Sequence, residues 1–509
     1  MRSHNSPKTA IKTWSTEYQT NKRHTETAIG KYCTRKTFFL GSRQINQKKF
    51  VLLQFETNNK VTTANVMLLV YTPKITNRLF YTLNVVLHTI LRVDFSMTTD
   101  RQLFAQHSGT KLSYASEPVA DEPFFKACRL LFETAISDQE PRPFDVGGTT
   151  ALFPVYGRDI ALPYDPFAAS FYLLSRYEEY LPHREDEHGR YLSAENLAVR
   201  HGFVNQASVD RWAIAVRDVI AARYPDFEFP ERKFNAVVTV DIDAAYNFLH
   251  KGVFRTVTGL ARDMIHRDFD QVSHRLRVLR HREPDPFDTF DYIIDTLAPH
   301  RDVPLVFFAL MADYGMFDKP IAHTNTYFRQ LLQHLGDFAK VGIHPSYYSP
   351  NNTALIATET RRLSDTLHRS IVRSRFHFLR QRLPASYQAL LSAGIKHDYS
   401  MGFADITGFR AGTGTPFPFF DLESDCQTEL TLHPFCVMDT TLQKYLALGP
   451  EQAMTQNAAL IDELRAVGGT FSCIVHNQNL AELYGWQGWR RVFEQMCNDL
   501  DSHPTAQAK

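Results

Sequence analysis

Short apolar runs alternate with amphipathic stretches along most of the chain after residue 66. The apolar run at 67–72 predicts a strand, and apolar positions at helical spacing predict helices at 77–91, 124–136 and 209–225. The stretch PDFEFPERK at 225–233 interrupts this pattern and is typical of a linker. We therefore expect a smaller α/β domain at residues 67–232.

Beyond residue 232 the alternation becomes regular. Strands are expected in AVVTVDID, VPLVFFAL, KVGIH, IVRSRFHF, ELTLHPFCVMD and GTFSCIVHN, with helical stretches between them. This order is typical of parallel βαβ units. Repeated over residues 233–505, it favours a closed or nearly closed (β/α) barrel, with a doubly wound open sheet as the alternative.

The first 66 residues lack this periodicity. They carry 12 Lys and Arg against 3 Asp and Glu, which leaves 44 basic and 52 acidic residues for the remainder of a chain of net charge +1. Three interpretations compete: a disordered basic extension, a start site placed upstream of a true start at Met67, and an arm that binds nucleic acid or anionic membrane. The functional prediction does not depend on this segment.

Composition narrows the class of protein. The chain is 44% hydrophobic and 22% charged, as in globular proteins, and its near-neutral charge argues against a general nucleic-acid binder. We expect no secretory signal, because no basic stretch leads into an apolar one with a small-residue cleavage site near the start, and no apolar run has transmembrane length. The cysteines form no CxxC pair, which suggests reduced thiols. We expect a cytoplasmic protein without a transmembrane segment, whose oligomeric state stays open.

Polar residues stand at the ends of the expected strands, where (β/α) barrels carry their working groups. Asp241 and Asp243 leave one strand on the same side, so one carboxylate can hold a metal while the other takes a proton. Capping of the next turn is the structural alternative. His344 ends a strand before Pro345, where a lone histidine is more often a packing residue.

Further candidates follow along the chain. In IVRSRFHF, alternation would place Arg373, Arg375 and His377 on one face of a strand. Such a face could bind a metal or an anionic substrate. The structural alternative is a solvated face, which is the usual position of arginine-rich segments. The glycine-rich GFRAGTG around Arg410 allows tight turns but is no phosphate loop. His433, Asp439 and His476 lie in the last two strands, and a strand-end histidine suits general acid catalysis.

The order of these groups resembles the polysaccharide deacetylase superfamily with the NodB homology domain, over residues 234–500. TVDID, GIHPS, GFRAGT, VMDTTL and IVHN are similar to its five motifs. The whole chain resembles a bacterial subgroup with an extra N-terminal α/β domain. The resemblance implies a distorted (β/α) barrel of about seven strands, and a divalent metal, commonly zinc, bound by Asp-His-His.

The chemistry implied is hydrolysis of an N-acetyl group on an amino sugar or related carbohydrate, in cell-envelope or surface-polysaccharide metabolism. The resemblance makes Asp243 and His344 metal ligands and Asp241 the general base, oriented by Arg410. It makes His476 the general acid, held by Asp439.

One departure concerns the second motif, which usually has histidines at i and i+4. Here Tyr348 stands at the second position, so another residue has to supply the third ligand. His377 is the first candidate, ahead of His433 and Asp398. Two alternatives stay open: a catalytically weakened carbohydrate-binding or assembly protein on the same barrel, and a hydrolase of another linear or cyclic amide.

Overall fold

A computed structural model describes residues 67–501. The three interpretations of the first 66 residues therefore lie outside the described residues. Within the described range, no helix combines the length and apolar character that a bilayer span requires.

The N-terminal part contains a four-stranded parallel sheet of order β2-β1-β3-β4. Its strands are β1 (Leu68–Tyr71), β2 (Phe95–Thr98), β3 (Lys111–Ala115) and β4 (Phe124–Lys126). A small hairpin follows, with strands β5 (Phe144–Val146) and β6 (Thr149–Ala151). The helices are α3 (Asn77–Leu83, continued as a π-helix to Ile90), α4 (Arg101–Gln106), α5 (Pro166–Leu174), α6 (Leu197–Arg200) and α7 (Ser208–Arg223).

The helices expected at 77–91 and 209–225 are confirmed. The helix expected at 124–136 is wrong. Phe124–Lys126 pairs in parallel with β3, and only a short 3₁₀ turn at Leu130–Phe132 follows. Apolar residues at helical spacing cannot reveal such a pairing, because buried strands and buried helices are equally apolar.

The C-terminal part is built on a nine-stranded sheet of order β12-β13-β11-β10-β9-β8-β7-β15-β14. Every pairing is parallel except that of β12 with β13. The strands are β7 (Asn235–Ile242), β8 (Leu305–Ala309), β9 (Lys340–Ile343), β10 (Arg373–Ser374), β11 (His397–Asp398), β12 (Phe417–Asp421), β13 (Cys426–Leu432), β14 (Val437–Met438) and β15 (Thr470–His476).

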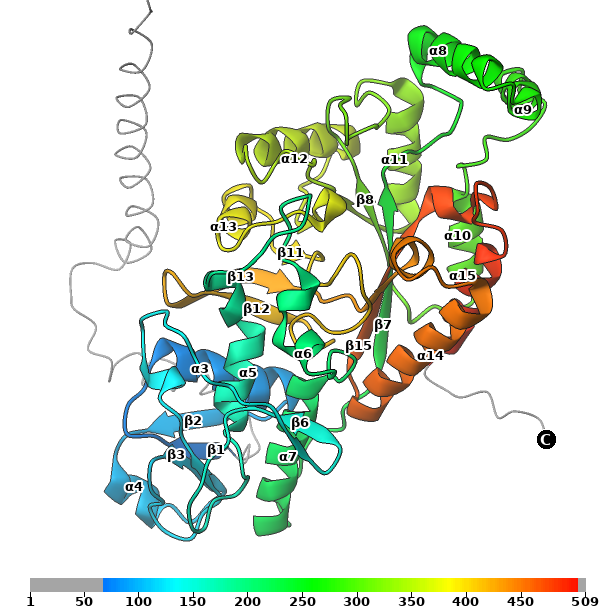
Figure 1. The fold of residues 1–509 in the computed structure, drawn as a ribbon. Coiled ribbons are helices and arrows are strands. Elements are labelled where there is room, and N and C mark those ends of the chain that lie inside the picture. The colour runs from blue at the N-terminus through cyan, green and yellow to red at the C-terminus, as the bar shows by residue number, and fades with distance from the viewer. Residues whose placement is uncertain (1–66, 502–509) are drawn as a thin grey trace, which may run out of the picture. The chain divides into compact units, whose positions relative to one another are not determined.

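Helices connect and flank these strands (Figure 1). They are α8 (Gly252–Ile265), α9 (Phe269–Leu279), α10 (Phe290–Leu297), α11 (Thr326–Phe338), α12 (Ala354–Leu367), α13 (Ala385–Ser392), α14 (Pro450–Val467) and α15 (Trp489–Asp499). The expected alternation of strands and helices is thus present. ELTLHPFCVMD, expected as one strand, is divided between β13 and β14.

The sheet curls, as the connection from β13 to β14 requires. These strands are seven steps apart in the sheet order, about 34 Å if the sheet were flat. The few residues between Leu432 and Val437 span at most about 17 Å. Within this connection, the Phe435 N–H donates to the carbonyl of Met401 beyond β11, and the Cys436 N–H donates to Ser472 on β15. No pairing of β13 with β14 is found among the described strands, so a closed barrel is not shown.

The first and last long strands of this sheet, β7 and β15, lie side by side. Asp241 on β7 stands in register with His476 on β15. The Thr239 hydroxyl donates to the carbonyl of Cys473, 234 residues away in the chain. The carboxyl ends of β7, β8, β9, β10 and β15 therefore meet at one edge, where the candidate residues were expected.

Both parts share one hydrophobic core. The Tyr81 hydroxyl on α3 donates to the carbonyl of Pro418 on β12 at 2.9 Å. Arg78 is fully buried and bonds Asp425 at 3.0 Å. The boundary expected at 225–233 stays a prediction, because the described residues 67–501 fall within one compact unit.

Candidate metal centre

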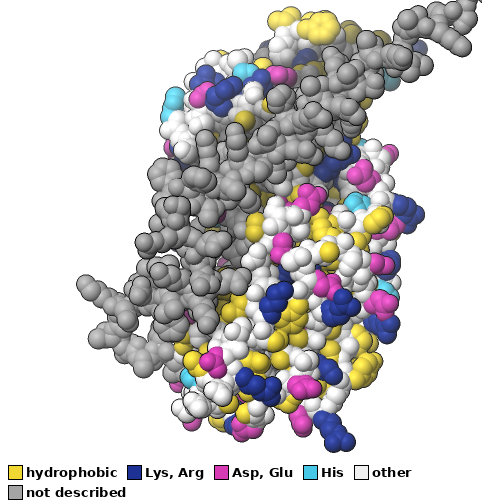
Figure 2. Space-filling model, turned by 90° about the vertical axis from the view of Figure 1, so that its left-hand side faces the viewer, with side chains coloured by type: hydrophobic (Ala, Val, Ile, Leu, Met, Phe, Trp, Pro, Cys, Tyr) yellow, Lys and Arg dark blue, Asp and Glu magenta, His cyan; other side chains and the backbone are white. Residues whose placement is uncertain are grey.

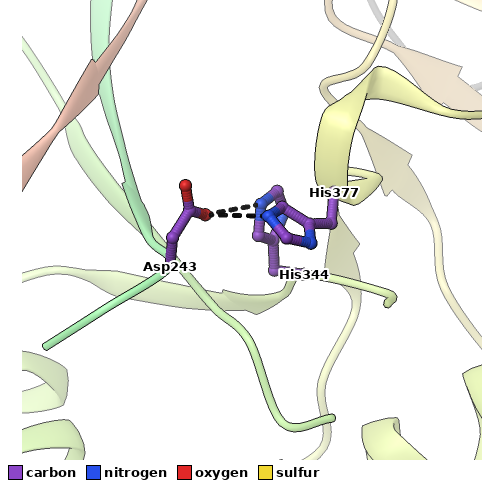
Figure 3. Close-up of side chains that lie close together, drawn as sticks. All are labelled: Asp243, His344 and His377. Atoms are coloured by element: carbon purple, nitrogen blue, oxygen red, sulfur yellow. Dashed lines mark ion pairs between the residues drawn. The ribbon is translucent and has the colours of Figure 1, made fainter. Parts of the chain in front are cut away.

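Three side chains from the carboxyl ends of neighbouring strands converge (Figure 3). Asp243 follows β7, His344 follows β9 and His377 follows β10. Their ligand atoms all lie within 4.8 Å of one another. The Asp243 Oδ1 is 3.3 Å from the Nε2 of His344 and 3.5 Å from the Nε2 of His377. The structure thus brings together the three residues that the sequence suggested as metal ligands.

The other ring nitrogen of each histidine is held by an acceptor. The Nδ1–H of His344 donates to the carbonyl of Arg375 at 2.5 Å, and the Nδ1–H of His377 donates to the carboxylate of Asp318 at 2.7 Å. These bonds fix the orientation of both rings and place each Nε2 toward Asp243. Sequence reasoning missed Asp318, which also accepts the N–H of Tyr347.

His377 reaches the centre by a different route from the one expected. Strand β10 comprises only Arg373–Ser374, so alternation on one strand face does not position His377. Instead it begins a 3₁₀ turn in which Phe378 and Leu379 have φ values of 59° and 54°. Left-handed backbone at such bulky residues costs about 1–3 kcal/mol each. It turns the chain directly after the His377 ring.

The cluster has the character of a cation site. The Oδ1 of Asp243 is buried and, among the described residues, has no hydrogen-bond partner. Burial alone would raise the pKa of Asp243, but the charges of His377 and the other facing histidines hold it well below its usual value. Two imidazoles and a carboxylate are a ligand set of catalytic zinc sites, in which a fourth position stays open.

Asp241 lies beside this cluster and is 3% exposed. Its Oδ2 is 3.8 Å from the Nε2 of His344, and its Oδ1 is 3.6 Å from the Nη1 of Arg375. Arg375 is fully buried, donates to the Thr239 hydroxyl at 2.6 Å and stacks over Phe308. Burial lowers the pKa of Arg375, although the charge of Asp241 opposes this.

The pairing expected between Arg410 and Asp241 is wrong. The Nε and Nη2 of Arg410 donate to both carboxylate oxygens of Glu179, at 2.9 and 2.8 Å, and its Nη1 donates to the carbonyl of Gly402. Glu179 comes from the N-terminal part, and its carboxylate binds the Arg410 guanidinium in a bidentate geometry. Arg375 is the arginine that lies beside Asp241.

His476 completes the cluster. Its Nδ1–H donates to Asp439 at 2.7 Å, and its Nε2 is 3.7 Å from the Oδ2 of Asp243. Burial would lower the pKa of His476, but the charge of Asp439 and its hydrogen bond raise it to about 9. Asp439 also accepts the side-chain amide of Asn479 and the backbone N–H of His476. The expected contact between His476 and Asp439 is therefore present.

The two weaker candidates for a third ligand lie elsewhere. His433 pairs with His397 at 3.1 Å and stacks on Tyr399, and burial lowers its pKa to about 3. Asp398 accepts the hydroxyls of Ser374 and Ser400, and burial raises its pKa to about 6. Neither belongs to the converging group.

A cavity of about 390 Å³ is lined by residues from both parts of the chain, and none of the residues of this cluster lines it. Leu379, two residues after His377, lines one side of it, and Arg410 lines another. Arg190 and Tyr191, from the N-terminal part, also line it. The Nη1 of Arg190 donates to the carbonyl of Phe378, which ties this loop to the residue that follows His377. The N-terminal part therefore shapes the surroundings of the candidate centre.

Comparisons with known proteins add limited information. Residues 68–225 match DUF7033, described as a family of unknown function. A search of curated proteins gave no match. A protein described as a polysaccharide deacetylase from Mycobacterium smegmatis is 13% identical, covers 53% of this chain and 86% of its own, and has a TM-score of 0.34.

Two further solved structures are similar at the same low level. A mutant of a CE4 family pseudoenzyme with restored enzymatic activity is 10% identical, over 53% of this chain and 62% of its own, with a TM-score of 0.26. A GH57 branching enzyme from Thermococcus kodakaraensis is 8% identical, over 52% and 67%, with a TM-score of 0.30. Such values identify neither a family nor an activity, whereas the geometry of the site restricts its chemistry directly.

Proposed function

We propose that this protein is a divalent-metal-dependent hydrolase that removes an N-acetyl group from an amino sugar or related carbohydrate. The observation that carries the proposal is the convergence of Asp243, His344 and His377 beside a second buried carboxylate, Asp241, and a histidine–aspartate pair, His476 and Asp439. Zinc is the ion that this set of oxygen and nitrogen ligands suits best.

Asp243, His344 and His377 would hold the ion. A bound zinc ion polarises an amide carbonyl and acidifies water, which is the chemistry that amide hydrolysis needs. The acceptors behind the two histidines, the Arg375 carbonyl and the Asp318 carboxylate, keep both rings oriented and basic.

Asp241 and His476 supply the two proton transfers. Asp241 takes a proton from the attacking water, and the Arg375 guanidinium beside it orients the carboxylate. His476, whose raised pKa favours the protonated ring at neutral pH, gives a proton to the nitrogen as the C–N bond breaks. Acetate and a free amine result. Asp439 holds the His476 ring in place.

The cavity lined by Leu379, two residues after His377, supports a carbohydrate as substrate. Its volume of about 390 Å³ and its mixed lining, with Tyr191, Tyr445 and Asp405 among the residues, offer aromatic faces and hydrogen-bonding groups together. Sugars need both, because their C–H faces pack on aromatic rings while their hydroxyls bond polar groups.

Acetate release from N-acetylglucosamine oligosaccharides by the zinc-loaded protein tests the proposal. The Asp241→Asn variant should bind zinc as the wild type does, because Asp241 is not among the three proposed ligands. Its kcat should fall by about 10²–10⁴-fold through loss of the general base. Asp405→Asn, which changes a cavity carboxylate outside the cluster, should affect KM more than kcat.

Two outcomes would count against the proposal. Equal rates for wild type and Asp241→Asn would remove the catalytic assignment. Stoichiometric zinc without any amide hydrolysis, combined with saturable oligosaccharide binding, would favour the catalytically weakened binding protein instead.

A further inference from the structure

Helices α8 and α9 form a hairpin between β7 and β8 that projects from the sheet (Figure 1). It follows directly on the segment that carries Asp241 and Asp243. Its attachment is polar: the Arg255 Nη1 donates to the carbonyl of Pro320 at 2.9 Å, and the Arg255 guanidinium stacks over Tyr314.

One side of α8 exposes large apolar side chains. Val253 is 81% exposed, Phe254 80% and Ile265 79%. Val257 and Met264 lie on the same side at helical spacing and are also exposed, as is Phe269 at the start of α9. Single exposed apolar residues are ordinary on protein surfaces, but a contiguous group of this kind marks an interaction surface.

The contact between the two helices is polar, which explains why the apolar side faces outward. Asp263 on α8 is buried and accepts two hydrogen bonds from Arg275 on α9, at 2.9 and 2.6 Å. A Cβ atom at Gly259 would lie 2.8 Å from the Arg275 Nη1, so the guanidinium fits against the helix only where there is no side chain. The hairpin is therefore held together without using its apolar side.

The hairpin is also basic, in contrast to the rest of the described chain. The hairpin itself, residues 252–279, contains 5 Lys and Arg against 3 Asp and Glu, and with its flanking residues, 250–283, it contains 8 against 4, whereas the chain after residue 66 has 44 against 52. On the face of the molecule seen in Figure 2, basic and acidic side chains are intermixed. An exposed apolar side flanked by a local basic excess is the pattern of helices that lie in the interface of an anionic bilayer.

We propose that the α8–α9 hairpin docks on anionic lipid membrane, with Phe254, Ile265 and their apolar neighbours inserted at the headgroup boundary. Charge decides between this partner and a second copy of the chain, because two basic hairpins repel each other while anionic lipid attracts both. The proposal does not depend on the hydrolase activity.

Docking would have a consequence for the metal centre. Arg255 fastens the hairpin to Tyr314 and Pro320, and the segment between these two contains Asp318, which holds His377. A membrane bound by the hairpin would therefore lie on the side of the molecule where the carboxyl ends of the strands meet. Substrates presented at a lipid surface are the class that this arrangement favours.

Co-sedimentation of the full chain with vesicles tests the proposal. Binding is expected to vesicles of phosphatidylcholine mixed with phosphatidylglycerol, to weaken as salt is raised, and to be absent with phosphatidylcholine alone. The double variant Phe254→Gln, Ile265→Gln keeps helix-compatible side chains and should lower the partition coefficient by roughly tenfold or more. Circular dichroism should show unchanged helix content.

The control is Tyr156→Ser, which removes a side chain that is 78% exposed in the N-terminal part. It should bind vesicles like the wild type. Undiminished binding by the double variant would overturn the proposal and assign the lipid contact to another segment, such as the basic first 66 residues. A third outcome would assign the apolar side to a second copy of the chain and overturn the proposal. In that case the wild type would not bind vesicles but would form a dimer, and the double variant would be monomeric.

Discussion

Among the buried arginines that stand beside carboxylates, Arg410 and Arg375 have sharply different surroundings. Arg410 forms a bidentate pair with Glu179, and Arg176 bonds the same carboxylate at 2.8 Å as well as Glu178 at 2.9 Å. Arg375 and Asp241 are 3.6 Å apart. In the described chain, the Arg375 Nε and Nη1 and the Asp241 Oδ1 have no hydrogen-bond partner.

The difference separates a structural arrangement from a chemical one. Buried charges that are fully hydrogen-bonded fix a conformation, because breaking any one bond leaves an uncompensated charge. Buried polar atoms left without partners call for another explanation, of which a bound ion, water or substrate is the simplest. The Glu179 network joins the N-terminal part to the curled sheet. The Asp241 cluster, by contrast, has the unpartnered polar atoms that binding of an ion, water or substrate would explain.

The largest effect is expected where the bonded network is broken. Glu179→Gln should lower the free energy of unfolding by about 3–5 kcal/mol, because Arg410 and Arg176 lose their shared carboxylate while still buried. Urea unfolding measures this. Glu185→Gln is the control, since Glu185 is an exposed residue 3.6 Å from Arg382, and its loss should change stability by less than about 1 kcal/mol. Similar values for both variants would remove the distinction between the two regions.

A smaller change in the free energy of unfolding is expected when zinc binds the cluster of Asp243, His344 and His377. Zinc at a hundredfold excess over its Kd should stabilise the wild type by about 2.7 kcal/mol, because it binds the folded cluster only. Asp243→Asn should abolish this gain, and Asp313→Asn, which changes an exposed carboxylate after β8, should retain it. Thermal unfolding with and without zinc measures both. An undiminished gain in Asp243→Asn would place the ion elsewhere.

The smallest effect is a displacement of pH dependence. His476 must stay protonated to act as an acid, and its pKa is raised to about 9. Activity should therefore persist through neutral pH and fall as pH rises through about 9. Asp439→Asn removes the charge that raises this pKa, so the fall should move toward the ordinary histidine value of about 6.5. The pH profile of kcat measures it, and an unmoved alkaline limb would contradict the role of Asp439.

Much of the sheet could be predicted because its strands are short, apolar and separated by helices. The same pattern marked Asp243 and His344 as strand-end residues, and parallel strands bring such ends together. His377 was predicted as a site residue because it would lie on an expected strand. That strand is only two residues long, and a left-handed turn follows it. The sequence therefore placed His377 in the converging group, but from a local structure that was wrong.

The remaining site residues depend on tertiary contacts that no local pattern records. Asp318 lies in an irregular segment after β8, and its bond to His377 exists only because that segment folds back. Glu179, from a distant part of the chain, forms the ion pair with Arg410. Arg375 is therefore the arginine beside Asp241. The alternation of Arg373, Arg375 and His377 along an expected strand was the sequence signal for Arg375 as a site residue. The same alternation is also typical of a solvent-exposed strand face.

The pairing of β7 with β15 has a consequence for how this protein is made. Asp241 and His476 face each other from strands at opposite ends of the sheet-forming sequence. During synthesis, β7 leaves the ribosome long before its neighbour exists, with one edge of a buried apolar strand unpaired. The proposed acid and base can meet only after nearly the whole chain has emerged, so truncated products retain the ligand residues but lack the His476 side of the site.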